Sequence, residues 1–136
     1  LIMPLRIEII TPEGELVDVD DATHVLLPGA DGEVGILPGH SPMACAMQIG
    51  VIHVDREEGQ TEVLASHGGF AEINSDHIMV LAESAEKAEE IDKARAEKAL
   101  KQARQKLRHA TEQERGHLEA AVARAHTRLR AARMAR

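Results

Sequence analysis

The residue types change abruptly near residue 84, and this change constrains the fold more than any other feature of the sequence. All five prolines and nine of the ten glycines precede residue 84. The later segment is dominated by Ala, Lys, Arg and Glu, and Gly116 is its one glycine. Proline and glycine interrupt helices, whereas Ala, Lys, Arg and Glu favour them. The composition therefore predicts two units, residues 1–83 and 84–136, of which the second is helical.

The formal charge divides at the same position. Residues 1–83 carry 2 basic and 15 acidic side chains, a balance of −13, whereas residues 84–136 carry 14 basic and 8 acidic ones, a balance of +6. Together the two units give −7 for the 136 residues. An asymmetry of this kind indicates that the two units have different partners.

Short alternating segments indicate strands in the first unit. Residues 5–9 alternate apolar and polar side chains, which is the period of a strand with one buried face. Residues 11–14, 57–60 and 74–76 contain the Pro, Gly, Asn and Asp residues typical of turns. The same reasoning predicts further strands at residues 15–19, 23–27, 50–54, 61–65, 70–73 and 77–81. Many short strands without a helix between them predict an antiparallel β-sandwich.

Apolar residues in the second unit have helical spacing. The steps from Ala96 to Ala110 repeat from Leu118 to Ala132, so two amphipathic helices with matching stripes are expected to pack antiparallel. Thr111 and the Glu three residues later fit a capping box, which starts the second helix at Thr111 and ends the first just before it. Because these stripes are mostly Ala, they bury little apolar area and the hairpin is expected to open readily. The predicted fold class is α+β: an N-terminal antiparallel β-sandwich followed by a C-terminal two-helix antiparallel hairpin.

Composition and motifs argue against several classes of function. Phe70 is the sole aromatic residue, which disfavours proteins that stack single-stranded bases on aromatic rings. A phosphate-binding loop, a GxSxG motif and an HExxH motif are absent. The histidines are scattered singly and Cys45 is the only cysteine, so we predict neither a metal site nor catalytic residues. The sequence contains no apolar run near the ~20 residues that span a bilayer, so we expect membrane contact only through partners.

Two motifs go beyond this generic patterning. Residues 32–42 read Gly-Glu-Val-Gly-Ile-Leu-Pro-Gly-His-Ser-Pro, and residues 91–96 read Ile-Asp-Lys-Ala-Arg-Ala. In this order, with a helical hairpin after the second motif, they resemble the epsilon subunit of bacterial F-type ATP synthase. Residues 66–70, Ser-His-Gly-Gly-Phe, also look like the Gly-Gly turn that precedes the late strands of this family. The resemblance covers nearly the whole chain.

The resemblance implies a non-catalytic subunit of the rotating central stalk. In this family the sandwich binds the gamma subunit and the c ring, which helps to couple proton translocation to ATP synthesis. The helices extend towards the catalytic alpha and beta subunits and then inhibit ATP hydrolysis. The resemblance also implies a peripheral position on the cytoplasmic face of the cell membrane, no resident cofactor and no nucleic-acid partner.

Two sets of contact residues follow from the resemblance. Asp31, Glu33 and His40 belong to the region that the family places against the c ring. In some bacterial members the folded hairpin binds ATP as a regulatory ligand, and the positions that match here are Glu86, Ile91, Asp92, Arg95, Ala96, Arg124 and Arg128. One position departs from those members, because Gln102 stands where they have a further arginine, with Arg104 two residues away.

Other interpretations of the same residues stay open at this point. Asp92 has the position of a helix cap, and Arg95 could pair with it or with a neighbouring glutamate instead of binding a nucleotide. At the level of the whole chain, the alternative is a free-standing adaptor whose basic hairpin binds a partner protein or nucleic-acid phosphates. Its basic residues would be Arg124, Arg128, Arg130 and Arg133, with Arg136. A small metal enzyme that uses the histidines is a third interpretation.

Overall fold

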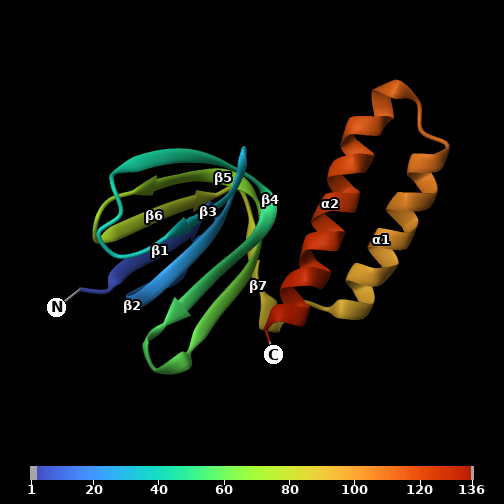
Figure 1. Ribbon diagram of the computed structural model, residues 1–136. Helices are drawn as coiled ribbons and strands as arrows, with labels where there is room; N and C mark the ends of the chain where they lie inside the picture. The colour runs from blue at the N-terminus through green and yellow to red at the C-terminus, as the bar shows by residue number, and fades with distance from the viewer. Residues whose placement is uncertain (1–2, 136) are drawn as a thin grey trace.

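The computed structural model describes residues 3–135 and contains a β domain followed by two helices (Figure 1). The second helix lies between the β domain and the first helix (Figure 1). The predicted fold class is thereby confirmed, with a sandwich that has a barrel-like closure. Within residues 3–135, neither helix is both long enough and apolar enough to cross a membrane.

The strands of the β domain form one sheet that closes on itself. Neighbouring strands follow the order β1, β6, β5, β4, β2 and β3, and β1 also pairs with β2. The pairing of β1 with β6 is parallel, which departs from the antiparallel arrangement expected throughout. It is possible because the long connection through β2 to β5 brings the chain back in the same direction. The strands are β1 (Leu5–Thr11), β2 (Gly14–Gly29), β3 (Gly32–Ile36), β4 (Met43–Arg56), β5 (Thr61–Ile73), β6 (His77–Ala82) and β7 (Ala85–Lys87).

The core of the β domain lies inside this closed sheet. On β1 the alternation predicted from the sequence is confirmed, because Leu5, Ile7 and Ile9 are fully buried while Arg6 is exposed. The other strands contribute aliphatic side chains to the same cluster, among them Val25, Leu27, Ile36, Ile52, Val54, Leu64, Ile73, Ile78 and Val80. Burial of this aliphatic surface is the main force that holds the domain together.

Long bent strands replace several of the short strands expected. Residues 15–19 and 23–27 belong to the single strand β2, and residues 61–65 and 70–73 belong to β5. The Gly-Gly pair expected as a turn is therefore a bend within β5. The strand pairs with β7 before the bend and with β6 after it. The turns predicted at residues 57–60 and 74–76 are confirmed as the β4–β5 hairpin, which includes the 3₁₀ turn η1 (Glu57–Gly59), and the β5–β6 hairpin.

Two strands lie where none was predicted. Residues 32–36, which have the composition of a loop, form β3 against the end of β2. Residues 85–87 form β7 against the middle of β5, so the sheet continues past the change of composition at residue 84. Both segments are extended because they pair with a neighbouring strand, and the local sequence does not reveal that pairing.

Each helix begins directly after a residue whose side chain caps its N-terminus. A short 3₁₀ turn, η2 (Ala88–Glu90), leads to α1 (Lys93–Arg108), and α2 (Glu112–Met134) follows. The Asp92 carboxylate accepts a hydrogen bond of 3.1 Å from the backbone N of Arg95 and caps α1. The capping box predicted at Thr111 is confirmed, since its hydroxyl and the Glu114 carboxylate each accept from the other residue's backbone N–H.

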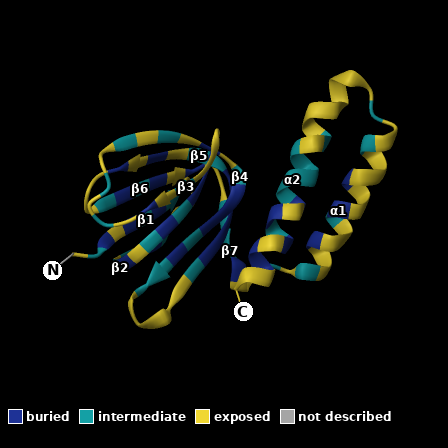
Figure 2. Ribbon diagram, viewed as in Figure 1, coloured by how far each residue is buried: buried dark blue, intermediate teal, exposed yellow. Residues whose placement is uncertain are grey.

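The helix α2 is buried on two faces. One face packs Ala125 and Leu129 against Ala96 and Leu100 of α1. The other face places Ala131 against a patch of the β domain formed by Val51, Val63, Ala65 and Ala88. Figure 2 shows burial concentrated in the half of the hairpin next to the β domain, whereas residues 111–117 at the far end are exposed. The hairpin is therefore anchored at its base and loosely packed at its tip.

Candidate functional site

A pocket of about 360 Å³ lies where the β domain meets both helices. Its walls come from β7, from the connection that includes η2, from the first turns of α1 and from α2. The volume falls within the range of sites that hold small organic ligands. The lining residues are Glu86, Glu90, Ile91, Asp92, Arg95, Ala96, Ala99 and Arg128.

One ion pair joins the β domain to α2 at this pocket. Glu86 lies on β7, which is held in place because residue 86 pairs with Ala65 of β5. The Arg128 guanidinium of α2 donates a hydrogen bond from Nε to the Glu86 carboxylate. Both side chains are only partly exposed, at 32% for Arg128 and 39% for Glu86, so the pair is better shielded from water than one on the open surface.

The first turn of α1 supplies a carboxylate and a second guanidinium. Asp92 is engaged as the helix cap, as the alternative interpretation of this residue predicted. Within residues 3–135 the arginines in ion pairs are Arg6, Arg56 and Arg128, so the Arg95 guanidinium does not pair with Asp92 or a glutamate. Arg95 is exposed at the edge of the pocket and is available to an anionic ligand.

The structure brings together six of the seven residues implied for ATP binding. Arg124 is the exception, because it lies one turn before Arg128 on α2 and does not line the pocket. Arg104 lines a different groove with Glu97 and Lys101, so it does not replace the arginine that Gln102 lacks. Glu90 and Ala99 also line the pocket, and Ala99 could have been found from its helical spacing to Asp92.

The residues implied for c-ring contact do not form one group. Asp31 lies in the exposed β2–β3 turn and Glu33 is exposed on β3; both line a groove of about 420 Å³ beside the start of β4. His40 follows the other end of β3, and its Nδ1 lies 2.6 Å from the backbone O of Ser41. Of the three residues implied for c-ring contact, Asp31 and Glu33 line this groove and His40 does not.

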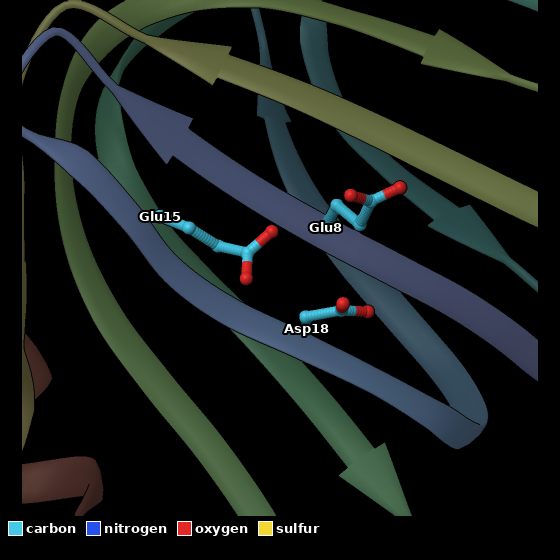
Figure 3. A group of neighbouring side chains, drawn as sticks. All are labelled: Glu8, Glu15 and Asp18. Atoms are coloured by element: carbon cyan, nitrogen blue, oxygen red, sulfur yellow. The ribbon is translucent and has the colours of Figure 1, made fainter.

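Three carboxylates gather elsewhere on the β domain (Figure 3). Glu8 of β1 lies next to Glu15 and Asp18 of β2. Arg6 donates two hydrogen bonds of 3.0 and 3.1 Å to Asp18, and these bonds hold the pKa of that carboxyl below its usual value. The His77 ring lies 2.8 Å from Glu8. Because neighbouring cationic or hydrogen-bonding groups engage two of these carboxylates, we infer no metal site from the cluster.

Comparison with known proteins matches the two parts of the chain to two domains of one protein family. Residues 4–88 match the family described as ATP synthase, delta/epsilon chain, beta-sandwich domain. Residues 89–133 match the long alpha-helix domain of the same chain. The ATP synthase epsilon chain of Lawsonia intracellularis is 45% identical over 108 residues, which cover 79% of this chain and 80% of that one.

Two further comparisons agree with this match. The ATP synthase epsilon chain of Bacillus subtilis is 42% identical over 103 residues and 76% of either chain. A chain in the cryo-EM structure of the Euglena gracilis mitochondrial ATP synthase (OSCP/F1/c-ring) has the same fold, with a TM-score of 0.83 at 24% identity over 92% of this chain and 79% of that one.

Proposed function

The chain belongs to the family of ATP synthase delta and epsilon chains, and from this premise we propose how its two parts serve the enzyme. It is a non-catalytic, epsilon-type subunit of the central stalk, and this assignment replaces the free-standing adaptor and the metal enzyme as interpretations. The β domain binds the gamma subunit and the c ring, and thereby helps to couple proton translocation to ATP synthesis. The protein is held peripherally at the cytoplasmic face of the cell membrane through these partners.

The helical hairpin is the regulatory part. Its two helices contain 16 and 23 residues, so end to end they would reach about 60 Å, at 1.5 Å per residue. In this extended form they would approach the catalytic alpha and beta subunits and oppose ATP hydrolysis. The folded form is held by Ala-rich packing with a few larger aliphatic side chains and by one partly exposed ion pair, so we expect the hairpin to open readily.

ATP is the proposed ligand of the pocket, and its lining carries this proposal. Arg95 and Arg128 can donate forked, charge-assisted hydrogen bonds to phosphate oxygens. Ile91 and Ala96 provide an apolar wall for the purine, while Glu86 can accept a hydrogen bond from an amino or hydroxyl group. Gln102 in place of an arginine removes one further phosphate contact, so we expect weaker binding than in relatives with that arginine.

Such a ligand would act as a switch because of where the pocket lies. Its walls belong to β7, α1 and α2, which separate when the hairpin extends. ATP would therefore bind the folded form in preference to the extended form and shift the population towards it. At a concentration of 100 times its dissociation constant, a ligand of this kind stabilises the folded form by about 2.7 kcal/mol.

Titration calorimetry of the full chain with ATP tests the proposal. Arg95→Ala is the decisive variant because its guanidinium has no ion-pair partner within the described residues, so the fold should not depend on it. Loss of a charge-assisted hydrogen bond worth about 1.5–3 kcal/mol predicts a drop in affinity of tenfold or more.

Arg104→Ala is the matched control for this titration. It removes the same charge from the same helix but outside the pocket, and should leave the affinity unchanged. Absence of heat at millimolar ATP, or heat that survives Arg95→Ala, would contradict the proposal. Arg124→Ala then decides whether this residue, which lies outside the pocket, contributes at all.

A further inference from the structure

His67 lies buried between the β domain and the hairpin, with 8% of its surface exposed. It stands two residues after Ala65 on β5, and side chains at this spacing share one face of a strand. Ala65 belongs to the patch that packs against Ala131 of α2, so His67 faces the same helix. Arg128 and Arg124 lie on α2 one and two turns before Ala131, and both are close enough for their charges to act on His67.

The hydrogen bonds around His67 satisfy only one of its ring nitrogens. Nδ1 lies 2.9 Å from the Ser84 hydroxyl, and the backbone N of His67 donates to the carbonyl O of Ser84 at 3.0 Å. Nε2 is buried and has no hydrogen-bond partner among the described residues. A neutral ring can leave Nε2 as an unused acceptor, whereas a protonated ring has two N–H donors and needs two acceptors.

The charged groups that act on His67 lie on α2 and β7. Arg128 and Arg124 face it from α2 and disfavour a third positive charge, while Glu86 of β7 acts in the opposite direction. Glu86 forms an ion pair with Arg128, and the Glu83 carboxylate lies close to Gly68, the residue after His67. Burial is the largest effect and, together with the two arginines, holds the pKa of His67 below its usual value.

We propose that His67 is a proton-sensitive latch: the hairpin docks on the β domain over a neutral His67 ring, and proton binding to this ring releases the hairpin. A proton on Nε2 would create a buried N–H without an acceptor beside two arginines. Moving α2 away exposes the ring to water and removes both guanidinium groups. The latch acts without nucleotide, so it is tested separately from the proposed ATP site, although Arg128 belongs to both.

The direction of the pH effect follows from linkage. With the hairpin docked, the pKa of His67 is depressed; with the hairpin released, the ring is in water and titrates near the ordinary value of about 6.5. The docked form therefore binds fewer protons, so docking is fully favoured above about pH 6.5 and weakens as the pH falls below it. Mild acid is expected to favour the released hairpin.

Energy transfer within the full chain, without nucleotide, measures this release. Cys45→Ser with Glu57→Cys and Gln113→Cys places one dye on the β4–β5 turn and one at the exposed tip of the hairpin. From pH 8 to pH 5.5 we expect the ratio of docked to released hairpin to fall, by about tenfold at most, because a released ring with a pKa of about 6.5 is then about ten times more often protonated than neutral. His67→Gln, which cannot take up a proton, should abolish this response. The matched control His126→Gln changes an exposed histidine of α2 and should retain it.

NMR titration of the His67 ring in the otherwise unchanged protein is an independent measurement. We expect its pKa to lie below about 6.5 and to rise in Arg124→Gln, which removes a facing charge but leaves the Glu86–Arg128 pair intact. Arg130→Gln, at an exposed position of α2, is the control and should change nothing. A pKa of His67 that is ordinary and unchanged by Arg124→Gln would overturn the proposal. Release of the hairpin by acid in His67→Gln would overturn it as well.

Discussion

At the scale of single residues, the bend of β5 depends on one glycine. Gly69 has a φ of +138°, and a Cβ atom built on it would lie 2.2 Å from the carbonyl O of Leu81. Both the backbone conformation and the close approach of β6 therefore exclude a side chain. This explains why a pair of glycines that looks like a turn in the sequence lies inside a continuous strand: it lets β5 change partner from β7 to β6.

Gly69→Ala is expected to destabilise the β domain by about 3 kcal/mol, because it adds backbone strain to a steric clash with main-chain atoms. Urea denaturation followed by circular dichroism measures this loss. Gly116→Ala is the control and should cause no loss of stability, since Gly116 has open space around it and no positive φ. Equal stability of the Gly69→Ala variant and the parent protein would contradict the assigned role.

Crosslinking after the substitution Glu33→Cys tests the proposed contact with the c ring. In the assembled enzyme, a cysteine introduced by Glu33→Cys is expected to form crosslinks to the polar loop of the c subunit, because Glu33 is exposed beside the groove it shares with Asp31. Mass spectrometry of the crosslinked product identifies the partner. Glu57→Cys, in the β4–β5 turn, should not form this product. Crosslinks from position 33 to other subunits alone would refute the contact.

At the scale of elements, the parts that obey local chemistry could be predicted from the sequence and the parts that depend on pairing could not. The N-terminal starts of both helices follow from Asp92 and the Thr111–Glu114 capping box, whose hydrogen bonds span three residues. In contrast, the Ala-Glu-Lys segment of β7 has no strand pattern of its own and is extended only because β5 lies beside it. The segments expected as two strands at residues 15–19 and 23–27 form the single strand β2, whose register is irregular near Ala22.

The second helix offers a test of how loosely the hairpin is folded. Gly116→Ala should stabilise α2 by about 1 kcal/mol, because Ala favours the helix and its Cβ atom meets no neighbour. Amide hydrogen exchange in the first turns of α2 should slow by about fivefold. Thr111→Ala removes the capping box and should have an effect of similar size in the opposite direction. Exchange that is unaffected by both changes would show that this end of the hairpin is not helical in solution.

At the scale of the whole molecule, α2 is the element on which docking depends. It contacts α1 on one face and the β domain on the other, whereas the main contacts of α1 among residues 3–135 are with α2. The pocket, the Glu86–Arg128 pair and His67 all lie at this junction. Each needs residues from distant parts of the chain, so composition and spacing alone did not locate the junction. The resemblance to a family supplied most of the pocket residues but gave His67 no role there.

The inhibitory role of the hairpin is tested by ending the chain after Glu90. This boundary keeps β7 and η2 within the β domain, which a cut at residue 84 would not, and removes both helices. In reconstituted ATP synthase we expect hydrolysis to rise severalfold while proton-driven synthesis is retained, because the contacts proposed for the gamma subunit and the c ring remain.

The full-length chain with Arg104→Ala is the control, since it alters α1 outside the pocket and leaves the hairpin present. Hydrolysis is measured over a range of ATP concentrations without a membrane potential, because ATP in the proposed pocket would itself favour the folded hairpin. Inhibition should therefore be strongest at low ATP and, if His67 acts as a latch, at mildly acidic pH. Hydrolysis that is the same with and without the hairpin under all these conditions would mean that the hairpin does not inhibit this enzyme.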